Sequence, residues 1–123
     1  MKVVETKSAP AAIGPYSQAM IYGNCVYTSG QIPLSPESGQ VVGSSITEQT
    51  EQVCKNVVNL LKASGSSIDK VVKTTCFLTD MNDFSAFNEV YARYFTGKPA
   101  RSTVAVKQLP RNALVEIETV AEI

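Results

Sequence analysis

The pattern of apolar and polar positions predicts two helices. Between residues 45 and 65, apolar side chains recur at the intervals of one helix face. Ser45 and Glu48 have the spacing of a capping box, which satisfies free amide groups at a helix start, and Gly65 supplies the end. A second apolar stripe at helical spacing predicts a helix over residues 84–95.

Short runs rich in β-branched and aromatic residues predict the strands. They cover residues 18–22, 25–29, 71–78, 102–106 and 114–121, and the first two are joined by a hairpin turn at Gly23-Asn24. With the helices between them, this order favours one α+β domain over residues 1–123. We expect a mixed sheet with both helices on one face.

Such a sheet leaves its second face without a helix to cover it. We expect strand faces too apolar for open water there, and we therefore expect a homo-oligomer that packs these faces together. The residues in question are Val72, Thr74, Cys76 and Leu78 on one strand, or Val115, Ile117 and Ala121 on another.

Composition removes several kinds of chemistry. The chain has no histidine, which excludes Ser-His-Asp and Cys-His nucleophile systems and histidine metal sites, so a general base is Glu, Asp, Lys, Tyr or Cys. Eleven basic residues balance eleven acidic ones, so no footprint for nucleic acid or an anionic membrane is expected. The three cysteines lie far apart and are expected to be free thiols. Without a signal peptide or a long apolar run, we expect a cytoplasmic protein.

Two charged positions are candidates for chemistry. Arg101 follows a Gly/Pro loop at the start of a strand, where its planar guanidinium could hold a carboxylate; the alternative is an exposed surface arginine. Glu116 and Glu118 share one face of an otherwise apolar strand. Such carboxylates are solvated, paired with a cation, or catalytic, and the sequence leaves these alternatives open.

A third candidate is the strand end at Ser29-Gly30, which could offer main-chain N–H groups to an anion, with Tyr16 as an aromatic wall. Ordinary turn chemistry explains these residues equally well.

Taken together, several segments resemble the RidA (YjgF-like) family. They are residues 11–18 (AAIGPYSQ), 27–33 (TSGQIP preceded by Tyr), 99–104 (PARSTV) and 114–117 (LVEI). The resemblance covers essentially the whole chain. It implies a chorismate-mutase-like fold and a homotrimer with sites in the clefts between subunits. It also implies a 2-iminobutanoate/2-iminopropanoate deaminase that needs no cofactor and no metal.

The resemblance also implies roles for particular residues. Arg101 would bind the carboxylate of a 2-imino acid, and Glu116 would orient and deprotonate the attacking water. Main-chain groups near Gly30 and Thr103 would hold the substrate. Tyr16, Ser29 and Asn88 would complete the wall of the pocket. Many relatives carry cysteine where this chain has Thr103, but a main-chain contact should survive that difference.

Two other functions stay open. The chain could bind 2-oxo acids as a regulator at the same clefts, without turnover. A ribonuclease or translation-inhibitor role is the other alternative, and zero net charge weighs against it. The expected partners are therefore small 2-imino and 2-oxo acids and further copies of the chain, and neither a membrane nor nucleic acid.

Overall fold

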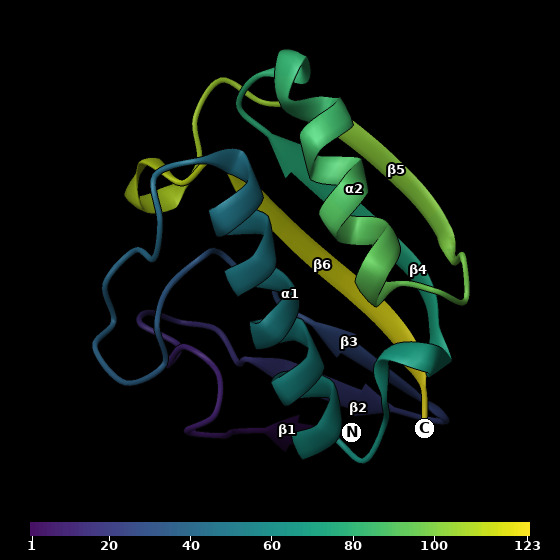
Figure 1. Ribbon diagram of the computed structural model, residues 1–123. Coiled ribbons are helices and arrows are strands. Elements are labelled where there is room, and N and C mark those ends of the chain that lie inside the picture. The colour runs from purple at the N-terminus through teal and green to yellow at the C-terminus, as the bar shows by residue number, and fades with distance from the viewer.

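Two helices and six strands form the computed structural model, which describes residues 1–123 (Figure 1). The strands are β1 (Lys2–Val4), β2 (Ala19–Tyr22), β3 (Cys25–Thr28), β4 (Val71–Leu78), β5 (Ala100–Ala105) and β6 (Val115–Glu122). The helices are α1 (Ile46–Ala63) and α2 (Phe84–Tyr94). Strand order in the sheet is β1-β2-β3-β6-β4-β5. Only β4 and β5 run parallel, because α2 connects them as a crossover.

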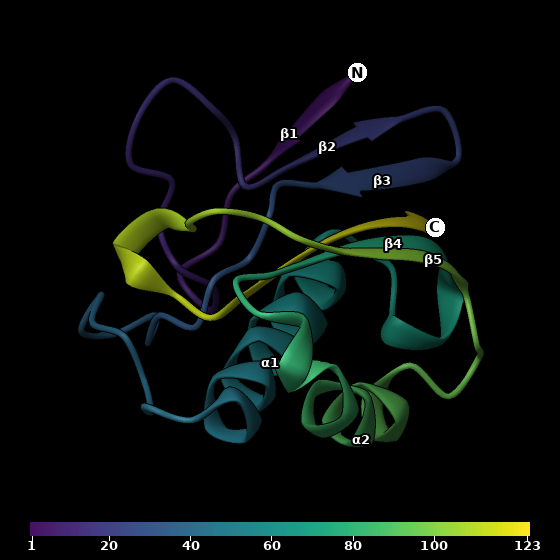
Figure 2. The ribbon, with the colours of Figure 1, turned by 90° about the horizontal axis from the view of Figure 1, so that it is seen from above.

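Both helices lie on the same side of the sheet, and Figure 2 shows the other side without a helix. This arrangement confirms the predicted α+β fold. The core lies between the layers, and its largest fully buried side chains include Phe87, Leu60, Leu61, Leu78 and Ile117. Neither helix is long and apolar enough to span a membrane.

The predicted start and end of α1 are confirmed. The Ser45 hydroxyl accepts a hydrogen bond from the Glu48 amide at 3.1 Å, and the Glu48 carboxylate accepts one from the Ser45 amide at 3.2 Å. Hydrogen bonds to the Glu48 carboxylate from the Ser44 amide, the Ser45 amide and the Ser45 hydroxyl lower the pKa of that carboxyl group. Gly65 follows the helix with a φ of 82°, a left-handed conformation that glycine adopts without strain.

Strand β1 was absent from the sequence prediction. It has only three residues, and its pairing with β2 over Lys2 to Val4 holds it in the sheet. These three residues are too few for an alternating pattern that would predict a strand. The remaining strands match their predicted ranges to within two residues, and β4 matches its predicted range at both ends.

The predicted uncovered apolar faces are wrong. The side chains of Thr74, Cys76 and Leu78 in β4, and those of Val115, Ile117 and Ala121 in β6, are buried within the same chain, on the helix side of the sheet. Val72 does not share their face, because a bulge between Val71 and Lys73 leaves it 53% exposed.

The open face is of mixed character instead. Its half-buried or exposed side chains come from the alternate positions of the central strands. They include Tyr27 in β3, Thr75 and Phe77 in β4, and Glu116, Glu118 and Val120 in β6.

Candidate functional site

Arg101 lies on the helix side of the sheet, at the edge strand β5. It pairs in register with Thr74 of β4, whose side chain is buried beneath α2, so the two side chains share that face. The guanidinium Nη1 donates a hydrogen bond to Oδ1 of Asn88 in α2 at 2.8 Å. The structure therefore brings two of the predicted site residues together and orients the guanidinium through one of them.

Three aromatic rings of α2 surround the same guanidinium. Its central carbon lies 4.7 Å from the centre of the Tyr91 ring, 5.4 Å from that of Phe84 and 5.9 Å from that of Phe87. Cation–π contacts of this kind stabilise a cation by roughly 0.5–1 kcal/mol where it is exposed and more where it is desolvated. A hydrogen bond of 2.8 Å between the Tyr91 and Thr74 hydroxyls fixes the closest ring. Tyr91 belongs to the apolar stripe that predicted the helix over residues 84–95, and nothing in the sequence indicated its contact with Arg101.

No carboxylate of the chain pairs with Arg101. The one salt bridge in the structure joins the exposed side chains of Arg93 in α2 and Glu51 in α1 at 3.8 Å. A half-buried cation without a counter-charge is a poor structural element, because desolvation costs free energy that no carboxylate of the chain offsets. The arrangement suits an anion that arrives from outside the chain, and a carboxylate matches the fork of the guanidinium.

Thr103 lies two residues further along β5, on the same face as Arg101 and next to Cys76 of β4. Its hydroxyl oxygen is buried and has no hydrogen-bond partner. Burial raises the pKa of the Cys76 thiol to about 11, which keeps it protonated at neutral pH. Cys76 is therefore an inert core residue and not a nucleophile.

Glu116 occupies the opposite face of the sheet, beside Gly30. A Cβ atom on Gly30 would lie 2.2 Å from Oε2 and 2.6 Å from Cδ of Glu116, so the carboxyl group rests against bare backbone. Backbone hydrogen bonds of 2.8 and 3.1 Å between Gln31 and Ile117 hold this segment on β6. Burial raises the pKa of Glu116, and the charge of Glu118 adds to the shift, whereas Glu118 itself is exposed.

Ser29 follows β3, precedes Gly30, and hydrogen-bonds to the segment just before β2. Its hydroxyl donates to the Ser17 carbonyl at 2.6 Å, and its amide donates to the Gln18 carbonyl at 2.9 Å. Tyr16 precedes these residues and is 54% exposed. The structure therefore places Tyr16, Ser29, Gly30 and Glu116 in one region of the surface.

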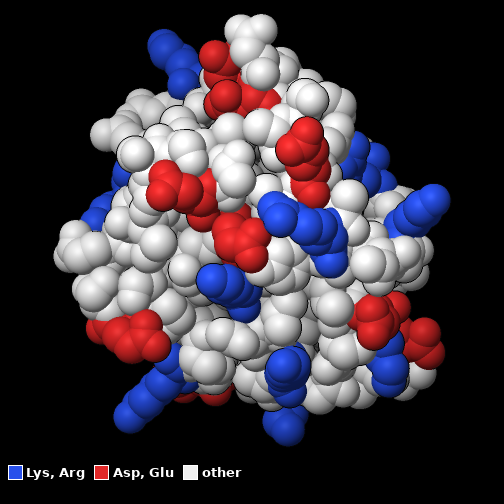
Figure 3. All heavy atoms as spheres, in the orientation of Figure 1, with Lys and Arg blue, Asp and Glu red and all other residues white.

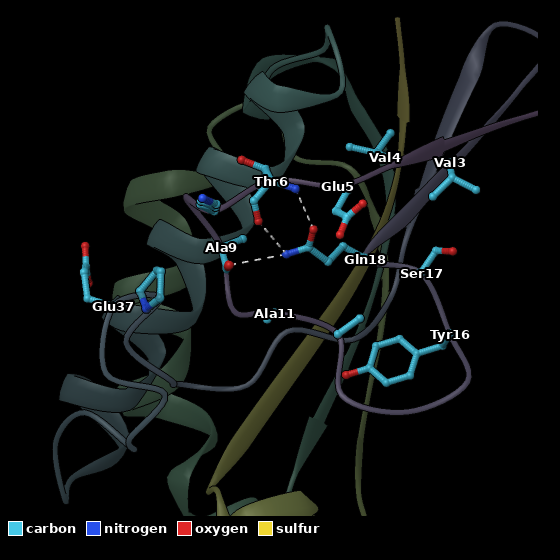
Figure 4. A pocket seen from close by; sticks show the side chains of 13 residues that line it. Val3, Val4, Glu5, Thr6, Ala9, Ala11, Tyr16, Ser17, Gln18 and Glu37 are labelled. Carbon is cyan, nitrogen blue, oxygen red and sulfur yellow. Dashed lines mark hydrogen bonds between the residues drawn. The ribbon is translucent and has the colours of Figure 1, made fainter.

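Tyr16 also lines a cavity of about 870 Å³ along the N-terminal segment, and Figure 4 shows its ring on one side with Glu37 opposite. The amide of Gln18 closes one wall through hydrogen bonds to Thr6 and Ala9. None of the other predicted site residues lines this cavity. This cavity is therefore not the predicted site, although it is large enough for a small ligand.

The seven predicted residues form two groups on opposite faces of the sheet. Glu116 pairs with Phe77, whose side chain lies on the open face, whereas Arg101 pairs with Thr74 on the helix face. Backbone and buried side chains of β4 separate the two groups. Within one chain, Arg101 and Glu116 therefore cannot contact the same small molecule.

The helix-covered face adds no competing cluster of charge. Acidic and basic side chains are interspersed on the helix-covered face, without a large patch of either sign (Figure 3). No three His, Cys, Asp or Glu side chains gather as metal ligands would. The fold and the two groups define a small α+β protein with a half-buried arginine that lacks a carboxylate partner on one face of its sheet and a half-buried carboxyl group on the other.

Comparison with known proteins identifies the family. The profile of the family described as Endoribonuclease L-PSP matches residues 6–123. AldR of Lactococcus lactis, which carries a regulator's name, is 53% identical over all of this chain and 98% of its own length. The 2-iminobutanoate/2-iminopropanoate deaminase of Mus musculus is 50% identical over 98% of this chain and 90% of its own length. The chain belongs to the RidA family.

Solved structures agree with this assignment. A Thermotoga maritima protein that is described as an endoribonuclease superposes with a TM-score of 0.97 at 52% identity. The match covers 100% of this chain and 98% of the Thermotoga chain. TdcF of E. coli, whose structure holds bound serine, superposes with a TM-score of 0.95 at 40% identity and covers 100% of this chain and 99% of its own. Relatives thus carry the names of deaminases, regulators and endoribonucleases, and the chemistry of the site has to distinguish them.

Proposed function

We propose that this chain is a hydrolytic deaminase that converts reactive 2-imino acids into 2-oxo acids and ammonia. The main observation behind the proposal is the environment of the Arg101 side chain. Its guanidinium is oriented by Asn88, flanked by three rings, and has no carboxylate partner in the chain. A small substrate with one carboxylate supplies the missing charge. The relatives named 2-iminobutanoate/2-iminopropanoate deaminase, at 46–50% identity, support the same substrate class.

The chemistry needs one base and accurate positioning. Arg101 holds the substrate carboxylate in a bidentate pair, which fixes the orientation of the neighbouring C=N bond. Glu116 takes a proton from water as the oxygen attacks the protonated imine carbon, and then returns it to the nitrogen. The carbinol O–H then gives its proton to the Glu116 carboxylate as the C–N bond breaks, so ammonia leaves and the carbinol oxygen becomes the carbonyl of the 2-oxo acid. The raised pKa of Glu116 suits this exchange, because proton transfer works best with a group whose pKa lies closer to the working pH.

The proposal requires more than one copy of the chain. A second copy can bring its Glu116 face against the Arg101 edge of the first, which joins the two groups that a single chain keeps apart. We propose a homotrimer in which Tyr16, Ser29, Gly30 and Glu116 of one copy face Arg101, Asn88 and Thr103 of the next. Three such sites close symmetrically, and the mixed character of the open face suits an interface with solvated clefts.

No cofactor or metal is needed for this reaction. The carbon of a protonated imine is already electrophilic, so binding, orientation and one carboxylate account for the acceleration. Positioning alone can contribute several kcal/mol to lowering a barrier, and general-base catalysis contributes about 10²–10⁴-fold.

The test uses an imine that a second enzyme generates in situ. A pyridoxal-phosphate-dependent dehydratase acting on threonine or serine releases the enamine, which tautomerises to the imine and hydrolyses slowly without assistance. Ammonia release is followed by a coupled assay with and without this protein. Acceleration proportional to the protein concentration supports the deaminase. Binding of 2-oxobutanoate without acceleration would instead identify a 2-oxo-acid-binding regulator.

A further inference from the structure

Arg101 also lines a cavity that the proposed reaction leaves unused. This cavity has a volume of about 550 Å³ and lies between the C-terminal end of α2 and the start of β5. Cavities of about 300–1,000 Å³ accommodate small organic ligands, so there is room for more than the short side chain of 2-iminobutanoate. Its lining residues are Tyr91, Ala92, Phe95, Thr96, Lys98, Pro99 and Arg101.

The charged groups of this cavity have one sign. Lys98 and Arg101 are its two charged lining residues, and no Asp or Glu lines it. Neither cation takes part in a salt bridge. The other walls are largely apolar and include Tyr91 and Phe95, whose rings stack with centres 4.3 Å apart. The cavity therefore offers apolar walls for methylene groups and a second cation in addition to the one that holds the substrate carboxylate.

The turn after α2 places Lys98 at this cavity. The Lys98 amide donates to the Phe95 carbonyl at 3.2 Å, and Lys98 has a φ of 52°. For a residue with a Cβ atom, this left-handed conformation is strained, and glycine would avoid the strain. A cation here also interacts favourably with the C-terminal end of α2, and that purely structural role is the alternative that a test must separate.

We propose, on the basis of the deaminase function above, that this cavity selects 2-imino acids with an acidic side chain. Arg101 holds the carboxylate next to the imine carbon. The methylene groups pass along the apolar wall, and Lys98 pairs with the distal carboxylate. The substrate class thereby extends from short neutral 2-imino acids to dicarboxylic ones, and the corresponding 2-oxo dicarboxylic acids bind as products.

Two product analogues of equal chain length test this selectivity. 2-Oxoglutarate and 2-oxopentanoate differ at the distal end, where one has a carboxylate and the other a methyl group. Their dissociation constants are measured by titration calorimetry on the full-length protein. We expect the wild-type protein to bind 2-oxoglutarate with a lower dissociation constant than 2-oxopentanoate. We expect Lys98→Gln to weaken the binding of 2-oxoglutarate by about 1.5-fold to fivefold, the range of an exposed ion pair, and to leave the binding of 2-oxopentanoate unchanged. Lys98→Arg should retain the preference.

The matched control is Lys62→Gln. Lys62 is the basic residue in the last turn of α1, so its loss removes a cation from a helix end without touching the cavity. It should leave both constants unchanged.

Equal effects of Lys98→Gln on both acids, or no effect on either, would overturn the inference. The deaminase proposal would survive those results if the protein still accelerates hydrolysis of 2-iminobutanoate. A wild-type protein that binds neither acid and accelerates no hydrolysis would refute both proposals.

Discussion

Replacing Arg101 with alanine gives the strongest test of the proposed chemistry. A four-carbon imino acid has little apolar area, so its carboxylate must supply most of the orientation. Removing one partner of a buried charge pair costs about 3–5 kcal/mol, and the half-buried position of Arg101 puts the expected loss near the lower end. With about 1.4 kcal/mol for each factor of ten, kcat/KM should fall by roughly 10²–10³-fold.

The fold should tolerate this change. Arg101 contributes cation–π contacts with three rings, but it is also a half-buried cation without a carboxylate partner. These two terms oppose each other, so we expect a melting temperature close to that of wild type. Arg101→Lys should recover activity only in part, because an ammonium keeps the charge over the Tyr91 ring but loses the bidentate fork.

The assay is imine hydrolysis coupled to a dehydratase, with melting temperature and oligomeric mass measured on the same samples. Arg93→Ala is the matched control, since Arg93 lies in α2 and its side chain is 64% exposed in a pair with Glu51. Its activity should stay at the wild-type level. A folded Arg101→Ala variant that hydrolyses imine as fast as wild type would show that this arginine does not hold the substrate.

The remaining predictions concern Glu116 as the base, Gly30 beside it, the Tyr91 ring next to the guanidinium, and the oligomeric state. Glu116→Gln should lower turnover by about 10²–10⁴-fold, whereas Glu118→Gln should change it little; a larger loss at Glu118 would mean that the base is misassigned. Because burial raises the pKa of Glu116, the folded state holds its proton more tightly than the unfolded state, and that stabilisation is lost as pH rises through the raised pKa. Glu116→Gln should therefore increase the melting temperature at neutral pH and lose this advantage in acid. Gly30→Ala should displace the Glu116 carboxyl and reduce kcat with little loss of stability, because the atoms in its way end a flexible side chain. Tyr91→Leu should raise the dissociation constant for 2-oxobutanoate about threefold or more, and Tyr91→Phe less, because phenylalanine keeps the ring under the guanidinium. Sedimentation equilibrium should give a trimer of the 13.2 kDa chain, and a monomer at micromolar concentration would rule out the shared site.

Local signals in the sequence predicted both helices and five of the six strands, and they marked Arg101 and Glu116 as candidates, whereas Asn88 and Thr103 came only from the family resemblance. The capping box at Ser45 and Glu48 predicted the start of α1, because these hydrogen bonds involve residues three apart in the chain. The alternation along β6 placed Glu116 and Glu118 on one face, since successive strand residues point to opposite sides. Arg101 and Glu116 could be selected because polar residues stand out in an otherwise apolar or loop context.

Tertiary structure alone decided which face the helices cover and where the site residues meet. A period of two shows that Thr74, Cys76 and Leu78 share a face, but it carries no information on which face packs against α1 and α2. The contact of Glu116 with Gly30 depends on pairing across more than eighty residues, and that of Arg101 with Tyr91 depends on a crossover between β4 and β5. Local patterns fix which residues belong together on an element, whereas the register and packing of distant elements fix the partners. That is why the chain brings each half of the proposed site together and keeps the two halves on opposite faces.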